Sequence, residues 1–330
     1  MVHKLYLYLK DHQFLFALFI IFIGWMMLEI KDIIVSVFLS YIIMASMLPM
    51  VDYLKKRKIP KVFAVIIPYF SVVLFILLLI VPLIPFFTGQ IEELLLKFPI
   101  YLDNSAKVLG IHLEANAINN YLNSQVNEMS KSVFQVTSKV FGGLFSIITV
   151  FVVSFYMLMY HDKFKKFIAS MFPKKDHDKV LETVGLVNEK LGSWLQGQMF
   201  LCLAIGSISG IALTLLGIPY ALPLALIAGL LEAIPTLGPI LSAIPAVIVA
   251  MTISPTMALI IILTYILIQM FENQFLVPKV MERAVGLNPV IVILGVSMGA
   301  KLLGVIGALL AIPFISLIIV IYKSIENQKK

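Results

Sequence analysis

The residues that could carry chemistry in this chain are a few isolated charges within long apolar stretches. Between Lys190 and Glu272 the only charged residue is Glu232. It lies among residues that break helices, namely Gly229, Pro235, Gly238 and Pro239. A carboxylate in hydrocarbon costs roughly 2.5–3.5 kcal/mol on insertion scales, and a broken helix leaves backbone groups free. We expect Glu232 either to bind a solute or coupling ion at this break, or to cap the broken helix.

A second isolated charge lies near the carboxyl terminus. From Ala284 to Tyr322 the only charged residue is Lys301. Glycines surround it on both sides, at positions 295, 299, 304 and 307. We expect Lys301 to bind an anion, to pair with Glu232, or to extend its amine to the membrane surface.

Polar residues at the ends of apolar runs are weaker candidates. Glu272, Asn273 and Gln274 follow the run 255–271 and either line a pathway or form the polar end of a helix. Gln196 and Gln198 precede the run 199–217. Ten residues are expected to shape hinges and hairpins: Gly229, Pro235, Gly238, Pro239, Pro245, Pro278, Pro289, Gly304, Gly307 and Pro313.

The sequence lacks the motifs of several other chemistries. It contains no P-loop, no dinucleotide-binding GxGxxG and no HExxH. Its single cysteine, Cys202, excludes a disulfide within the chain, and its five histidines show no ligand spacing. We therefore expect no enzyme activity, no metal site and no cofactor, apart from a transported or coupling Na⁺ or H⁺.

The composition places these charges in a membrane. Hydrophobic residues make up 61% of the 330 residues and charged residues 13%, about half the share of a soluble protein. The net charge of +7 is explained by basic cytoplasmic loops, since positive charges gather on that side of a membrane, and not by nucleic-acid binding. The fold class is therefore all-α and polytopic.

The apolar runs predict about six full spans, over residues 13–28, 33–51, 62–91, 140–160, 199–217 and 255–271. The basic loop 52–61 is expected in the cytoplasm, which also places both termini there. Four regions follow: an amino-terminal scaffold (1–91), an external amphipathic insert (92–139), a fourth span with a cytoplasmic amphipathic helix (140–197), and a transport core (198–330).

Two apolar segments look like broken hairpins instead of spans. Residues 219–233 are too short to cross a membrane, and Pro245 is expected to interrupt the return segment to 253. The segment 288–322 repeats this plan around Lys301. Re-entrant hairpins at 219–253 and 288–322 would enter from opposite faces, as in inverted-repeat transporters, with a site where their tips meet.

The external insert contains an amphipathic helix. Apolar residues recur at alternating spacings of four and three, at positions 122, 126, 129, 133, 136 and 140. This seam packs either on its own protein or, as in a coiled coil, on a neighbouring subunit.

Three segments carry a family resemblance. LLGIPYALPLALIAGLLEAIPTLGPILSAIPA (215–246), FENQFLVPKVMERAVGLNPVIVIL (271–294) and GAKLLGVIGALLAIP (299–313) resemble the AI-2 exporter family of bacterial membrane proteins. The resemblance implies a multispan secondary transporter of the bacterial cytoplasmic membrane, with re-entrant hairpins and a homo-oligomeric assembly, of which a pentamer is one form. Thr236 stands where many members have an aromatic residue, and Asn288 where many have histidine before Pro289. Both are added to the pathway candidates.

Several functions remain open at this point. The first is a secondary transporter that exports a small polar solute or signal such as autoinducer-2, driven by an ion or proton gradient. The second is a Na⁺(Li⁺)/H⁺ antiporter, which the resemblance also implies. A passive channel or a membrane scaffold is the alternative from another class. The expected partners are membrane lipid and a small solute or monovalent cation.

Overall fold

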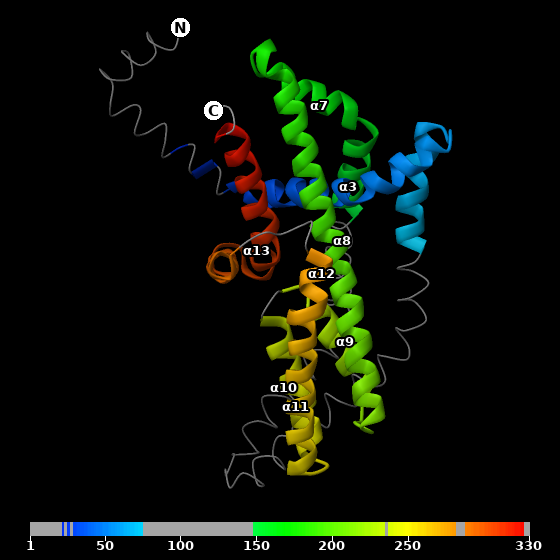
Figure 1. Ribbon diagram of the computed structural model, residues 1–330, viewed down its shortest axis with the longest axis vertical. Helices are drawn as coiled ribbons and strands as arrows, with labels where there is room; N and C mark the ends of the chain where they lie inside the picture. The colour runs from blue at the N-terminus through cyan, green and yellow to red at the C-terminus, as the bar shows by residue number, and fades with distance from the viewer. Residues whose placement is uncertain are drawn as a thin grey trace, which may run out of the picture.

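The computed structural model describes residues 22, 25–26, 29–74, 148–234, 237–281 and 288–326, and this part of the chain consists of helices joined by short turns, without strands (Figure 1). Most of the expected first span and the whole external insert lie outside the described residues, as do Pro235 and Thr236. Four helical stretches are long and apolar enough to cross a membrane: Lys31–Lys56, Lys174–Leu215, Pro255–Val280 and Val290–Glu326. The chain is therefore a multi-pass membrane protein.

The amino-terminal helices form one packed cluster. Helix α3 (Lys31–Lys56) ends at the basic loop, where Lys58 adopts a positive φ of 64°, and a further helix covers Lys61–Leu74. The helix Ile148–Met159 returns to this pair. Their shared core contains the fully buried Met44, Val51 and Val65 with Leu158.

The central element is α8 (His177–Leu215), a helix of 39 residues. It follows α7 (His161–Ser170) and a short 3₁₀ turn (Lys174–Asp176). The sequence divided this region near residue 197 into a cytoplasmic helix and a span, but the structure joins both into one helix. A single buried glycine, Gly197, is no barrier, since glycine weakens a helix interior by only about 1 kcal/mol and leaves its hydrogen bonds in place.

Helix α8 packs against α3, α7, α9, α11, α12 and α13 and runs through most of the length of the molecule (Figure 1). Helix α3 crosses it near its middle. A Cβ atom added at Gly192 would lie 2.5 Å from the carbonyl oxygen of Ala45, so glycine permits the close approach of α3 to α8. The core at this crossing includes Leu191 and Trp194.

The segment 219–253 forms a helical hairpin. Helix α9 (Ala221–Leu231) and helix α10 (Leu237–Met251) pack against each other, and the chain leaves helical structure at Glu232 after α9. The expected interruption at Pro245 is wrong, because Pro245 lies inside α10. A proline removes one hydrogen bond of the helix, and the packing of neighbouring helices compensates for that loss within a membrane.

Helix α11 (Pro255–Phe271) has the bounds that the sequence predicted. Ser254 caps it, since its hydroxyl accepts a hydrogen bond from the amide of Met257 at 3.0 Å. The chain remains helical beyond α11, through a π-helical turn η2 (Glu272–Leu276) and helix α12 (Val277–Met281). The chain is thus helical on both sides of Glu272, which is buried and does not form an exposed polar end of the helix, the second of its two expected roles.

Helix α13 (Pro289–Glu326) is a hairpin whose arms meet at a sharp bend. Leu303 and Gly304 leave helical geometry, and Gly304 has a positive φ of 63° that favours glycine. A Cβ atom at Gly299 would lie 2.2 Å from the carbonyl oxygen of Gly307, so the two arms touch through glycine backbone. The bend expected within 288–322 is thus present, and Pro313 lies buried in the second arm.

Candidate functional site: a buried carboxyl pair

The site begins at the end of α9, where the chain turns into α10. Glu232 follows the last residue of α9, and its side chain is only 2% exposed. Gly238 makes this turn tight, since a Cβ atom there would lie 2.1 Å from the carbonyl oxygen of Leu231. The break that the sequence indicated therefore places a carboxyl group inside the protein.

The partner of Glu232 is Glu272, the first residue of η2. Glu272 is 5% exposed, and each of the two carboxyl groups acts on the other. Two ionised carboxylates have only acceptors and repel each other, so neighbouring buried carboxyl groups favour a proton or a cation between them. The structure thus brings two carboxyl groups together between the end of α9 and the end of α11.

The π-helical turn is what presents Glu272 to the pair. Single π turns are rare and occur frequently at functional sites, because one extra residue changes which side chain faces inward. Gln269, three residues earlier, donates from Nε2 to Oε2 of Glu272 at 3.2 Å. Asn273 and Gln274, which the sequence grouped with Glu272, are exposed and lie outside the pair.

Helix α8 holds the other side of the site. The Nε2 atom of Gln198 donates to the backbone carbonyl oxygen of Glu232 at 2.8 Å. Gln196, two residues earlier, instead donates to the carbonyl oxygen of Ser46 on α3 at 2.6 Å. The sequence indicated Gln198 only as a weaker candidate for the site, and Gln269 was not among the predicted site residues. Gln269 lies on the same helical face as Glu272, and that spacing is the signal that could have identified it.

Close packing of α8 and α9 explains the role of Gly229. A Cβ atom at Gly229 would lie 2.8 Å from the carbonyl oxygen of Cys202 and 3.2 Å from the Cα atom of Gly206. Small residues let two helix backbones approach closely in membranes. This contact brings the end of α9, and with it Glu232, against Gln198.

The structure separates Lys301 from this pair. Lys301 is exposed beside the bend of α13, and it makes no ion pair within the part of the chain that the structure describes. The charged neighbour of Glu232 is Glu272, and Oε2 of Glu232 has no hydrogen-bond partner there. The carboxyl site thus forms from α8, the first hairpin and η2, whereas the sequence placed it where two hairpin tips meet.

The remaining candidates have local roles. Asn288 caps α13, since its Oδ1 accepts from the amide of Val290 at 2.9 Å, and Pro289 begins that helix. The carbonyl of Pro239 accepts from Ser242 at 3.0 Å, and Pro278 is exposed on α12. Among the described residues no group of three or more His, Cys, Asp or Glu side chains could hold a metal ion.

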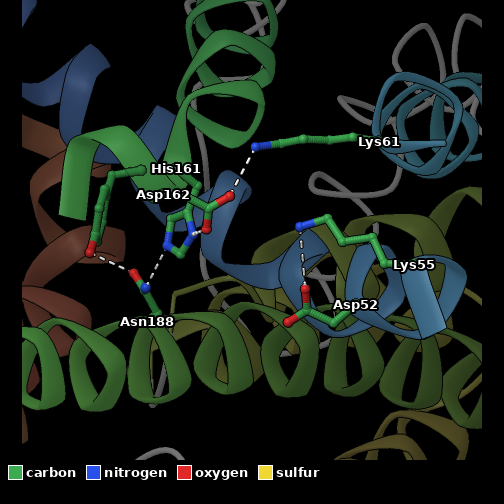
Figure 2. A network of polar contacts seen from close by, with 7 residues as sticks. Asp52, Lys55, Lys61, His161, Asp162 and Asn188 are labelled. Carbon is green, nitrogen blue, oxygen red and sulfur yellow. Dashed lines mark hydrogen bonds and ion pairs between the residues drawn. The ribbon is translucent and has the colours of Figure 1, made fainter. Parts of the chain in front are cut away.

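A second polar network joins the other end of α8 to α3 and α7 (Figure 2). Tyr41 donates to Oδ1 of the buried Asn188 at 2.5 Å, and Nδ2 of Asn188 lies 2.9 Å from Nε2 of His161. If the amide donates, His161 accepts and is neutral. Burial lowers the pKa of His161 from 6.5, in agreement with that assignment.

Ion pairs border this network on the exposed side. Lys61 contacts Asp162 at 2.9 Å, and Lys55 contacts Asp52 at 3.6 Å (Figure 2). The hydrogen bond from Lys61 lowers the pKa of Asp162. The pair of Lys61 and Asp162 connects the basic loop to the first turn of α7, whereas Lys55 and Asp52 pair within α3. Exposed pairs of this kind contribute little to stability.

Comparison with known proteins identifies the family. The model of the AI-2E family transporter matches residues 14–327. The chain belongs to this family. Relatives include "Putative transport protein YrrI" of Bacillus subtilis, 25% identical over 293 residues (85% of this chain and 82% of the relative), and "Putative transport protein MT0215" of Mycobacterium tuberculosis, 25% identical over 306 residues (88% and 83%). "Putative transport protein YueF" of Bacillus subtilis is 25% identical over 327 residues (91% and 88%).

Family and fold together define the general role of the chain. It is an AI-2E family protein with several helices suited to cross a membrane, and it has a role in membrane transport.

Proposed function

We propose that this AI-2E family protein is a secondary transporter that exports a small polar solute or signal such as autoinducer-2, driven by an ion or proton gradient. The coupling site is the carboxyl pair of Glu232 and Glu272. One observation carries the proposal: two buried carboxyl groups act on each other within an apolar helix bundle.

The physical reason is that the pair cannot be left without a cation. Two carboxylates 4 Å apart repel each other by about 4 kcal/mol at an effective dielectric constant of 20. When a proton between them leaves, another proton or a monovalent cation has to take its place. A site that requires exactly one bound cation at a time is suited to couple an ion gradient to a second event.

The position of the pair supports a role in conformational change. Glu232 lies at the turn between α9 and α10, and Glu272 lies in the π-helical turn after α11. Helix breaks are the places where chains absorb changes in backbone angle. Exchange of the bound cation therefore alters the contact between the hairpin, α11 and α8, which is the differential interaction that an alternating transporter needs.

The same pair favours a second function, Na⁺(Li⁺)/H⁺ antiport. Carboxylate and amide oxygens are hard ligands that suit a small alkali cation, and Gln198 and Gln269 bring amide groups to the pair. In this case the cation that replaces the proton is itself the transported solute. A passive channel needs no such exchange.

The test uses the full-length protein in liposomes with an imposed pH gradient. We expect proton-driven flux of autoinducer-2 or of Na⁺ in the native protein, and loss of that flux in Glu232→Gln and in Glu272→Gln. Glu182→Gln is the matched control, because Glu182 is an exposed carboxylate on α8. Retained flux in both pair variants contradicts the proposal.

The transported species separates the two carriers. Efflux of autoinducer-2 without cation flux supports the exporter, and electroneutral exchange of Na⁺ for H⁺ supports the antiporter. Fluxes far above carrier rates and independent of the pH gradient support a channel instead.

A further inference from the structure

Three buried hydroxyl groups lie on helices α8, α10 and α11, which lead away from the carboxyl pair. Ser209 on α8 and Ser242 on α10 are each 1% exposed, and Tyr265 on α11 is 8% exposed. The hydroxyls of Ser209 and Tyr265 have no hydrogen-bond partner within the described part of the chain. Ser242 donates only to the carbonyl of Pro239 in its own helix. Since an unpaired buried hydroxyl costs free energy, Ser209 and Tyr265 each call for a partner such as a bound water molecule.

The register of the helices places all three on the same side of the pair. Tyr265 precedes Glu272 by seven residues, which is two turns on one face and about 10 Å along α11. Ser242 follows Gly238 by four residues, about 6 Å from the turn that carries Glu232. Ser209 follows Gln198 by eleven residues, about 16 Å along α8. Each of the three helices leads away from the carboxyl pair in the same direction.

Contacts confirm that these helices face one another. Gly206 and Gly210 on α8 pack against Gly229 and Ala225 on α9, so the two helices run antiparallel. Tyr265 shares a buried cluster with residues of α8, α9 and α10. Figure 1 shows α11 beside the second half of α8, and the two helices are in contact.

Polar side chains also follow one face of each of two helices that are in contact. On α8 these are Gln198, Cys202 and Ser209, and on α11 they are Tyr265, Gln269 and Glu272. Spacings of three, four and seven keep each set on one helical face. Packing in an apolar bundle does not require polar side chains at these positions, whereas movement of an ion does.

We propose that these polar residues line a conduit for water and protons. The conduit leads from the carboxyl pair into the interior of the helix group α8–α11, and the hydroxyls of Ser209, Ser242 and Tyr265 lie along its wall. The conduit deepens the proposed function and rests on it, since it supplies the coupling ion to that same pair. Tyr265 is a positioning residue: its hydroxyl accepts a proton from one water molecule and donates its own to the next, so no charge stays on the ring.

Thiol labelling tests the conduit without any transport measurement. In the full-length protein carrying Cys202→Ala, single variants Ser209→Cys and Ser242→Cys are treated in liposomes with a small, cationic, water-soluble methanethiosulfonate. The matched control is Ser316→Cys, since Ser316 on α13 is 5% exposed and its hydroxyl also has no partner in the described chain. We expect labelling at least tenfold faster at 209 and 242 than at 316. Equal rates at all three positions overturn the conduit.

A transport measurement tests the role of the Tyr265 hydroxyl. Tyr265→Phe keeps the ring, and we expect the maximal proton-driven flux to fall at least fivefold with unchanged half-saturation for the transported solute and unchanged thermal stability. Tyr69→Phe is the control, because Tyr69 is also 8% exposed but its hydroxyl contacts Ser154 outside this group. Equal flux in the two variants contradicts the assignment of Tyr265.

The two proposals fail separately. If Glu232→Gln keeps its proton-driven flux, the coupling site is wrong, while labelling at 209 and 242 still decides whether a water path exists. If Glu232→Gln abolishes flux but labelling at 209 and 242 matches that at 316, only the conduit is wrong.

Discussion

Replacement of Gly238 by alanine tests how tightly the first hairpin holds the carboxyl pair. The added Cβ would lie 2.1 Å from the carbonyl oxygen of Leu231 and 2.9 Å from the backbone nitrogen of Glu232. Both are backbone atoms, so no side chain can rotate away. Because real Cβ contacts are essentially never shorter than 3.0 Å, α9 and α10 must separate by at least 0.9 Å at this point.

The size of this displacement sets the expected effect. Hydrogen bonds between nitrogen and oxygen vary over about 0.5 Å in length, so a 0.9 Å shift next to Glu232 disturbs its 2.8 Å bond with Gln198. Overpacking of this kind costs about 1–3 kcal/mol. At roughly 2 °C per kcal/mol for a chain of this size, the unfolding temperature in detergent should fall by about 2–6 °C.

The assay pairs thermal unfolding, followed by far-ultraviolet circular dichroism, with proton-driven flux in liposomes. We expect Gly238→Ala to lose both stability and at least nine-tenths of the flux, roughly the tenfold that 1.4 kcal/mol represents. Gly185→Ala is the matched control, since nothing lies within 4 Å of a Cβ at that position of α8. Alanine there should stabilise the helix by about 0.5–1 kcal/mol. If Gly238→Ala has the same unfolding temperature and the same proton-driven flux as Gly185→Ala, the inference that the turn requires glycine at position 238 is wrong.

Two further predictions concern the second hairpin and the network at α7. Gly299→Ala should lower the unfolding temperature relative to Gly185→Ala, because its Cβ would lie 2.2 Å from the carbonyl oxygen of Gly307; equal unfolding temperatures would refute the contact between the two arms. Burial lowers the pKa of His161, so the folded protein binds fewer protons than the unfolded chain as the pH falls through 6.5, and stability should decrease on that side. Thermal unfolding at about pH 5.5 and 7.5 should show a smaller difference in His161→Gln than in the native protein, and identical differences would contradict the buried, neutral histidine.

Much of the helical layout could be predicted because hydrophobic length and helix breakers act locally. The predicted bounds 255–271 match α11, and the bend expected between residues 288 and 322 occurs at Gly304. The differences arise at two residues that were candidates to interrupt or end a helix. Pro245 lies inside α10, and the chain continues through Glu272 as a π turn. Neighbouring helices compensate for one lost hydrogen bond, and this compensation cannot be read from a single segment.

The composition of the carboxyl site was harder to predict than its existence. Glu232 stood out because a lone charge in a long apolar run has a desolvation cost that must be met by a partner. Pairing with the oppositely charged Lys301 was one of three expected roles for that residue, but the charged neighbour of Glu232 is the like-charged Glu272. A proton or a cation between two carboxyl groups makes them compatible, and charge complementarity alone does not anticipate that arrangement.

The amino-acid sequence by itself thus determined that this protein lies in a membrane, that its helices break after Leu231 and near Lys301, and that burial of Glu232 has a cost. These are consequences of hydrophobic length, backbone chemistry and the cost of burying a charge, which act over a few residues. Only the tertiary structure decided which groups meet. Glu232 and Glu272 come together because Gly229 lets α9 approach α8, Gly238 turns the chain back, and the π turn points Glu272 inward.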